Sequence, residues 1–133
     1  MDEDLITDLL RSKGETVRGS SRPDAELIEM AQRLFAGRRF CIVRNWLLLD
    51  VMHSDEDCRQ LKAQGCEPIV VYASELAYDS GVDAPRMGAI RSSYQSAFKD
   101  FWFETKNSVF ILAGVGARKW ASVPALLALD ASD

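Results

Sequence analysis

The sequence is poor in the features on which membrane insertion and disulfide scaffolds depend. No apolar run approaches the ~20 residues that a membrane-spanning helix needs. The first four residues read MDED, whereas a signal peptide begins with basic residues and an apolar stretch. The three cysteines, Cys41, Cys58 and Cys66, contain no short pair of the kind found in zinc sites and redox motifs. We therefore expect a cytoplasmic protein with reduced thiols and no membrane partner.

Side chains for metal binding and catalysis are also scarce. His53 is the only histidine, and although Asp50, Asp55 and Asp57 lie near it, their spacing matches no metal loop. Cys58 is five residues from His53 across a predicted helix start, so the two side chains need not face one another. We predict that the protein holds no metal and no cofactor. We favour a binding protein over an enzyme.

The composition is that of one ordinary domain with an uneven charge distribution. The chain has 133 residues, of which 47% are hydrophobic and 27% charged. The net charge of −4 opposes general binding to nucleic acid. Residues 1–37 carry eight acids and five bases, whereas residues 86–120 carry six bases and two acids. The last third of the chain is therefore locally basic.

Two N-terminal segments have apolar residues at helical spacing. The first covers residues 2–12, and the second runs from the Ser21–Asp24 region to Gly37. Between them lies a polar segment, GETVRGSS, at residues 14–21. We therefore predict an N-terminal helix and flexible linker over residues 1–20 and a single α+β domain over residues 21–133.

Strand patterns dominate after residue 39. The β-rich residues 40–43 and 46–51 flank Arg44–Asn45, which is either a hairpin turn or the middle of one continuous strand. Residues 102–105 and 108–113 predict a hairpin around Lys106–Asn107. The class is therefore α+β, with N-terminal helices packed on a mostly antiparallel, hairpin-rich sheet.

Two later segments carry helix-start signals. Ser54 is expected to cap a short acidic helix that Gly65 ends. The capping box Ser92-x-x-Gln95 favours a helix over residues 92–101, and a strand there stays open as the alternative.

Both predicted turns place a base beside an asparagine, which suggests a binding surface. If the turns lie at the same end of the sheet, they form a basic rim with neighbouring tryptophans, of a kind that suits an anionic partner or a protein hot spot. The candidate binding residues are Arg44, Asn45, Trp46, Lys106, Asn107, Arg118, Lys119 and Trp120. The alternative is that the tryptophans belong to the core and the bases are ordinary turn residues.

The glycines before Arg118 invite a further interpretation. Gly114-Val115-Gly116 resembles a short phosphate-binding loop, but such a loop needs more glycine and a following helix. A flexible turn is the simpler interpretation.

Two stretches of the sequence carry a resemblance. Cys41–Trp46 and Phe103–Leu112 resemble a small uncharacterised family of pseudomonad and phage-associated proteins. The resemblance covers about the last two-thirds of the chain, brings no catalytic residue and implies a bacterial or prophage setting.

Three functions follow in order of preference. The first is a non-catalytic interaction protein, an inhibitor or adaptor with a larger protein as its partner. The second is a binder of nucleic acid or a phosphate ligand that uses the basic C-terminal third. The third is a small enzyme that uses His53 and nearby carboxylates.

Overall fold

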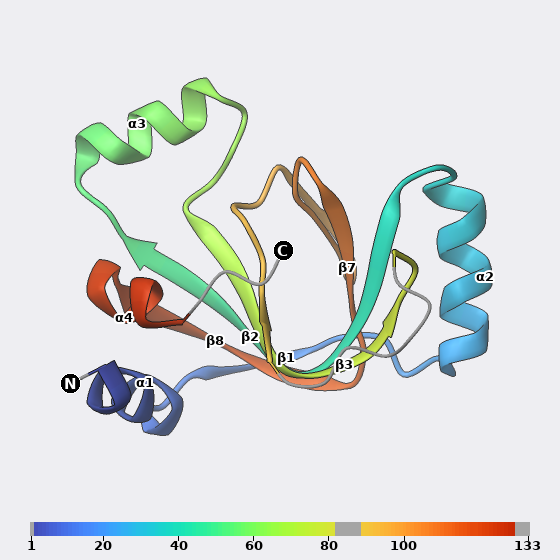
Figure 1. Ribbon diagram of the computed structural model, residues 1–133, viewed down its shortest axis with the longest axis horizontal. Helices are drawn as coiled ribbons and strands as arrows, with labels where there is room; N and C mark the ends of the chain where they lie inside the picture. Colours follow the sequence, from blue (N-terminus) through green and yellow to red (C-terminus); the bar gives the residue numbers. More distant parts are fainter. Residues whose placement is uncertain (1, 82–88, 130–133) are drawn as a thin grey trace.

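The chain folds around one long, bent strand, as the computed structural model in Figure 1 shows for residues 2–81 and 89–129. Within these ranges there are four helices and eight strands. The helices are α1 (Asp2–Arg11), α2 (Asp24–Leu34), α3 (Asp55–Ala63) and α4 (Val123–Ala128). The strands are β1 (Glu15–Arg18), β2 (Arg39–Met52), β3 (Ile69–Asp79), β4 (Ile90–Arg91), β5 (Ala97–Lys99), β6 (Trp102–Glu104), β7 (Ser108–Leu112) and β8 (Val115–Ser122).

Strand β2 organises the sheet, which is mixed. On one side it pairs with β3 in the antiparallel direction. On the other side its first part pairs with β7 and its second part with β8, both in parallel. The remaining pairings, which join β1 to β8, β4 to β3, and β6 to both β5 and β7, are antiparallel. The expected α+β class is plausible for this arrangement, but the expected mostly antiparallel sheet is only partly matched.

Of the two alternatives for Arg44–Asn45, the hairpin turn is wrong and the continuous strand is confirmed, because β2 runs through these residues without a break. Asn45 does adopt a positive φ of 52°, the property that suggested a turn, but here it bends one continuous strand. The bend lies where β7 and β8 diverge, and Trp46 fills the fork between them. Its Nε1 donates to the Ala113 carbonyl at 3.0 Å, and 1% of the residue is exposed. Trp46 is therefore a core residue.

The hairpin around Lys106–Asn107 is confirmed, since β6 and β7 pair on either side of it. Thr105 fixes this turn. Its buried hydroxyl accepts from the backbone amides of Asn107 and Ser108, at 3.2 and 3.0 Å. Two exposed side chains, Lys106 and Asn107, are thereby held on a defined turn.

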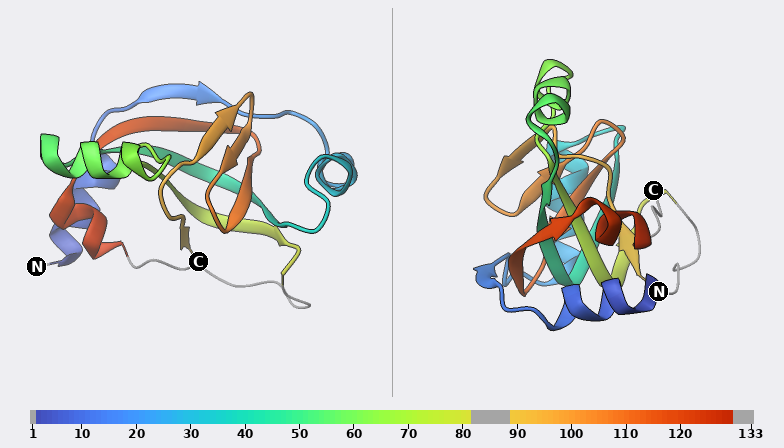
Figure 2. Two further views of the ribbon diagram at one scale, coloured as in Figure 1. Left: turned by 90° about the horizontal axis from the view of Figure 1, so that it is seen from above. Right: turned by 90° about the vertical axis from the view of Figure 1, so that its left-hand side faces the viewer.

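The helices cover separate parts of the curled sheet, as the further views in Figure 2 show. Helices α1 and α4 lie together at one end, where Leu9, Val51 and Leu126 share a core cluster. Helix α2 covers the other end and buries Leu27 and Ala31 against β2 and β7. Helix α3 has no fully buried residue. The two N-terminal helices thus lie at opposite ends of the sheet. Within the described residues, no helix is long and apolar enough to cross a membrane.

The segment expected to be an irregular linker contains strand β1. Residues Glu15–Arg18 pair with β8, and the Ser20 amide donates to the Leu112 carbonyl at 2.8 Å. Gly19 must lack a side chain, because a Cβ there would lie 2.1 Å from the same carbonyl oxygen. The first 20 residues are therefore joined to the sheet.

The segment 92–101 contains no helix. The Ser92 hydroxyl, expected to cap a helix, instead accepts from the Val71 amide at 2.8 Å. The Gln95 amide donates to the Ile69 carbonyl at 2.9 Å, and Ala97–Lys99 form β5. Pairing with β3 and β6 has replaced the local helical preference, and the strand alternative holds for part of the segment.

Candidate functional site

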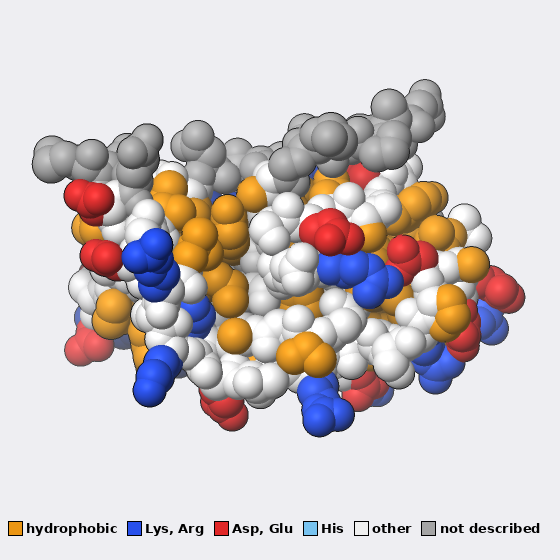
Figure 3. Space-filling model, turned by 90° about the horizontal axis from the view of Figure 1, so that it is seen from below, with side chains coloured by type: hydrophobic (Ala, Val, Ile, Leu, Met, Phe, Trp, Pro, Cys, Tyr) orange, Lys and Arg blue, Asp and Glu red, His pale blue; other side chains and the backbone are white. Residues whose placement is uncertain are grey.

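The eight candidate residues do not form one basic rim. Arg44 forms an ion pair with Asp24 of α2. Lys106 and Asn107 line a hollow near α3, whereas Arg118 lines another beside the start of β1. The face of the molecule in Figure 3 agrees with this dispersion, because its Lys and Arg side chains are scattered between patches of hydrophobic ones.

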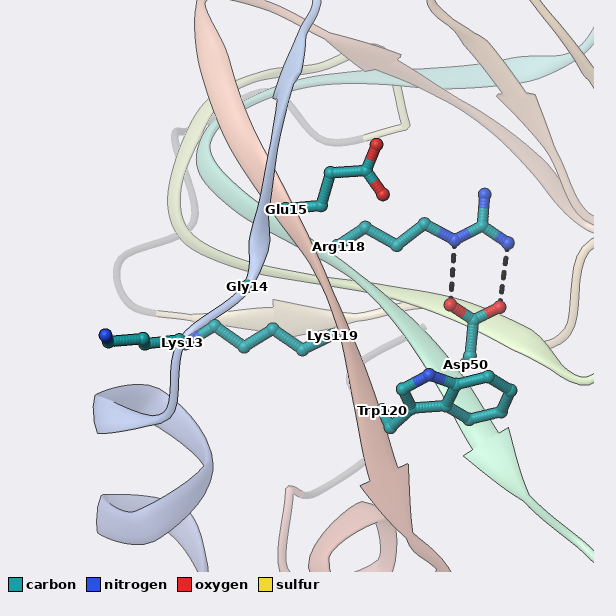
Figure 4. A pocket seen from close by; sticks show the side chains of 7 residues that line it. All are labelled: Lys13, Gly14, Glu15, Asp50, Arg118, Lys119 and Trp120. Carbon is teal, nitrogen blue, oxygen red and sulfur yellow. Dashed lines mark hydrogen bonds and ion pairs between the residues drawn. The ribbon is translucent and has the colours of Figure 1, made fainter.

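Residues Arg118, Lys119 and Trp120 are the only three candidates that line the largest hollow described, of about 640 Å³ (Figure 4). They are consecutive on β8, so their side chains alternate across the sheet. Arg118 and Trp120 lie on one face, beside Asp50 of β2, and Lys119 lies on the other.

Among the described residues, Trp120 and Leu127 are the most exposed large hydrophobic ones, each at 69%. A second hollow, of about 230 Å³, lies between β8 and α1 and is lined by both Trp120 and Met52. Met52, on the neighbouring strand, is 53% exposed. We call Trp120, Met52 and the two hollows that share the indole the Trp120 surface.

Arg118 is held in place by Asp50 on the adjacent strand. Its Nε and Nη2 donate to the two carboxylate oxygens at 2.7 Å each, the bidentate geometry that Figure 4 shows. The hydrogen bond to Asp50 is the main cause of the raised pKa of Arg118. The pair is partly exposed, so it contributes little stability, but it fixes the side chains beside the indole.

Lys119 has a structural role. Its Nζ donates to the carbonyl oxygens of Leu9 and Leu10 at 3.1 and 3.0 Å, so it satisfies the C-terminal end of α1. The aliphatic stem passes beside Gly14, where a Cβ would lie 2.7 Å from the Lys119 Cγ. The buried ammonium group is therefore engaged by α1.

Lys13 is a different case in the same hollow. Its side chain points away from the Asp50–Arg118 pair (Figure 4), and it forms no ion pair or hydrogen bond with residues 2–81 and 89–129. Lys13 is therefore an exposed cation at the rim of the Trp120 surface.

Asn45 and Trp46 contribute to a third hollow, of about 360 Å³, on the α1 side of the sheet. Most of its lining is apolar, and two of the lining residues, Leu10 and Val115, are exposed. Trp46 is one of its lining residues, although 1% of the residue is exposed and its indole is held in the core.

Lys106 and Asn107 line a hollow that lies next to the one lined by His53. Tyr94 lines this hollow of about 230 Å³ and also a neighbouring one of about 190 Å³, which His53 and Asp57 line. His53 Nε2 and the Tyr94 hydroxyl lie 2.6 Å apart. Burial is the main cause of the raised pKa of Tyr94, so its phenol keeps its proton at neutral pH.

The carboxylates expected to lie near His53 separate in the structure. Only Asp57 approaches it, with Oδ2 at 3.9 Å from Nδ1, too far for a hydrogen bond. Asp50 binds Arg118 instead. Among the described residues, no group of three or more metal-ligating side chains is arranged to hold an ion.

The glycine segment before Arg118 is a turn followed by a strand. Gly114 has a φ of 71°, and its amide donates to the Ser20 carbonyl at 2.8 Å. Gly116 lies within β8, where a Cβ would meet the Trp46 ring at 2.3 Å. Strand β8, and not a helix, continues directly from these glycines, so the phosphate-loop interpretation does not fit.

A family model described as a domain of unknown function (DUF6957) matches residues 18–128. The chain belongs to this family. The match begins at the last residue of β1 and ends at the last residue of α4, so it includes strands β2 to β8. No curated protein and no solved structure matches the chain.

Sequence reasoning included Trp120 but missed Met52, Lys13 and Tyr94. Met52 directly follows the predicted strand of residues 46–51, and nothing local indicates that its side chain stays exposed. Tyr94 lies in the segment 92–101, for which a helix was favoured and a strand was the alternative, and no helix forms there. Its approach to His53 joins segments 41 residues apart and has no short-range signal.

Proposed function

We propose that the chain is a non-catalytic interaction protein, an inhibitor or adaptor in the cytoplasm of a bacterium or in a prophage setting, and that it binds a protein partner through the Trp120 surface. The observation that carries the proposal is the indole of Trp120, which is 69% exposed between two hollows. Tryptophan is among the residues that dominate binding energy in protein interfaces.

The ordered surroundings of Trp120 make its exposed indole suited to binding a partner. Its strand lies between β1 and β2 for part of its length, and the Asp50–Arg118 pair holds the adjacent side chains. A surface that is already ordered loses less conformational entropy when a partner binds. The two hollows on either side of the indole can receive side chains of that partner.

Charge indicates the chemistry of the partner. Lys13, at the rim, forms no ion pair or hydrogen bond with the described residues, and Asp50 is neutralised by Arg118. Glu15 also lines this hollow, but it points to the Arg118 side, away from Lys13. After the hydrogen bond to Asp50, the charge of Glu15 contributes to the raised pKa of Arg118. The favoured occupant is a segment of another protein in which an apolar side chain lies beside a carboxylate. The apolar group packs on Trp120 and Met52, and the carboxylate pairs with Lys13.

A random peptide display library tests this proposal, with selection on the full chain alone and the affinity of the selected peptides then measured for the full chain and for Trp120→Ala. Selected peptides should combine an aromatic or aliphatic residue with Asp or Glu. They should bind Trp120→Ala about 30-fold more weakly, the effect of losing ~2 kcal/mol. Leu127→Ala is the matched control, because Leu127 is equally exposed, lies on α4 and lines neither hollow. It should bind like the wild type.

Two outcomes would contradict the proposal. The first is a set of peptides that bind the wild type and Trp120→Ala equally, or no enriched peptide at all. The second is micromolar binding of single- or double-stranded DNA at physiological salt that the Lys106→Ala/Arg118→Ala variant abolishes. That result would favour nucleic-acid binding, for which loss of two phosphate contacts reduces the salt dependence by about two units.

A further inference from the structure

The two hollows around Tyr94 lie apart from the Trp120 surface and share Leu61, Gln64 and Tyr94. They are therefore neighbouring parts of one depression. Its polar groups come from the end of β2, from α3 and its C-terminal turn, from residues 93–94, and from the β6–β7 turn. We call this the Tyr94 pocket.

We infer that the Tyr94 pocket binds a small ligand through a carboxylate or phosphate group, with Lys106, Asn107, Gln64 and Tyr94 as the hydrogen-bond donors. Three of these side chains donate through nitrogen, and Lys106 adds a full positive charge. The side chain of Lys106 forms no ion pair or hydrogen bond with residues 2–81 and 89–129. The ammonium group thus has no carboxylate of its own in the described part of the chain.

The donors on the turn are already positioned. Thr105 holds the backbone of the β6–β7 turn through the two hydrogen bonds to its hydroxyl, and Arg38 Nη2 donates to the Thr105 carbonyl at 2.8 Å. Lys106 and Asn107 therefore project from a fixed turn. A ligand that binds there loses little free energy in ordering the backbone.

Tyr94 is fixed from the opposite side. The segment that carries it is bonded to β3 through Ser92 and Gln95. When His53 Nε2 carries the proton, it donates to the Tyr94 oxygen over 2.6 Å and leaves the phenolic hydrogen for an acceptor in the pocket. Burial is the main cause of the raised pKa of Tyr94, and the charges of Arg91 and Asp57 act on it in opposite directions. The phenol therefore stays neutral and keeps its hydrogen for donation.

Among the described residues, one acid lines the depression, and it indicates where the anionic group lies. Asp57 lines the hollow beside His53 and is absent from the lining of the hollow beside Lys106. Repulsion between like charges places a bound carboxylate or phosphate at the Lys106 end. Leu61 and Cys66 provide an apolar wall there, and the volume of about 230 Å³ limits the group to a small molecule or the end of a larger one.

The inference is tested by titrating the full chain with inorganic phosphate and, separately, with acetate, while the amide chemical shifts are recorded. The ionic strength is held constant, and sodium chloride serves as the reference. We expect saturable shifts at residues 64, 94, 106 and 107 with at least one anion. Phosphate alone indicates a phosphate-bearing ligand, acetate alone a carboxylate, and both indicate a site for either group.

Lys106→Met should weaken the binding at least fivefold. Lys99→Met is the matched control, because it removes the same charge from β5, outside the pocket, and it should leave the affinity unchanged. Tyr94→Phe removes only the hydroxyl and should also weaken binding relative to the wild type. An unchanged spectrum away from the pocket would show that this variant keeps its fold. Absence of saturable shifts, or equal effects of Lys106→Met and Lys99→Met, would overturn the inference.

Discussion

At the scale of single residues, two buried serines that are alike in exposure differ in what their hydroxyls bond. Ser92 Oγ accepts from the Val71 amide and donates to the Ser93 carbonyl at 2.7 Å. Ser108 Oγ is buried without a hydrogen-bond partner in the described structure. A buried hydroxyl without a partner costs roughly 1–3 kcal/mol, whereas a bonded hydroxyl adds to stability.

The same substitution should therefore have opposite effects at the two positions. Ser108→Ala should raise the free energy of unfolding by about 1 kcal/mol, because it removes an unsatisfied polar group. Ser92→Ala should lower it by about 1–3 kcal/mol, because the Val71 amide is left without its acceptor. Urea denaturation with unchanged m-values is the measurement. Equal losses in both variants would show that Ser108 Oγ is bonded in solution.

The adjacent bases on β8 show what sequence could and could not indicate at this scale. Arg118 and Lys119 were predicted to lie in one basic rim, but the strand places them on opposite faces, where Arg118 binds Asp50 and Lys119 binds the end of α1. Alternation follows from any strand assignment. The partners do not, because they lie 68 and 110 residues away in sequence.

At the scale of elements, one ion pair joins the beginning of β2 to the end of β3. Arg39 donates from Nε and Nη2 to the two oxygens of Asp79, at 2.9 and 2.6 Å, and the Asp79 side chain is fully buried. The Gly81 amide adds a third hydrogen bond. The hydrogen bond from Arg39 is the main reason that the pKa of Asp79 lies below its ordinary value of 3.8.

Asp79→Asn should lower the free energy of unfolding at neutral pH by about 1–3 kcal/mol. A carboxyl whose pKa is lowered by folding stabilises above its unfolded pKa, and this contribution falls as the pH drops through the folded value. The difference between wild type and Asp79→Asn should therefore stay constant from neutral pH down to about pH 5 and decrease below 3.8. Urea denaturation across this range is the measurement.

Asp50→Asn is the matched control, because it breaks a similar bidentate pair with Arg118 that is more exposed to solvent. Its effect on stability should be smaller. A difference between wild type and Asp79→Asn that does not change with acid would contradict the assignment of the stabilisation to the ionised carboxylate.

Elements with strong local signals were predicted well. The Ser54 cap is confirmed, since its hydroxyl accepts from the Asp57 amide, and so is the hairpin at Lys106–Asn107. Short segments that pair with distant strands were not. Residues 15–18 pair with residues 115–118, and residues 92–95 bond to β3, so their structure depends on partners that no local pattern reveals.

At the scale of the whole molecule, the first 20 residues complete the body that the remaining chain forms. Val17 packs against the inner core cluster and Leu9 against the cluster of α4. Strand β1 covers the edge of β8 as far as Arg118, and Lys119 bonds the end of α1. The polar composition of the GETVRGSS segment conceals this role, because an edge strand needs few apolar side chains. The proposed division at residue 20 stays a prediction that truncation can test.

Two truncations separate the contributions of α1 and β1. A chain of residues 21–133 loses both, together with the burial of Leu9, worth about 2 kcal/mol, and the strand pairing that covers β8. Since a domain of this size is stable by only ~5–15 kcal/mol, we expect this chain to unfold or to aggregate through the uncovered edge. A chain of residues 14–133 keeps β1 and should remain folded with a lower melting temperature, measured by circular dichroism. If residues 21–133 melted at the temperature of the full chain, the N-terminal segment would be a separable unit after all. In that case, deleting α1 would remove one wall of the Trp120 surface without lowering the stability of the fold.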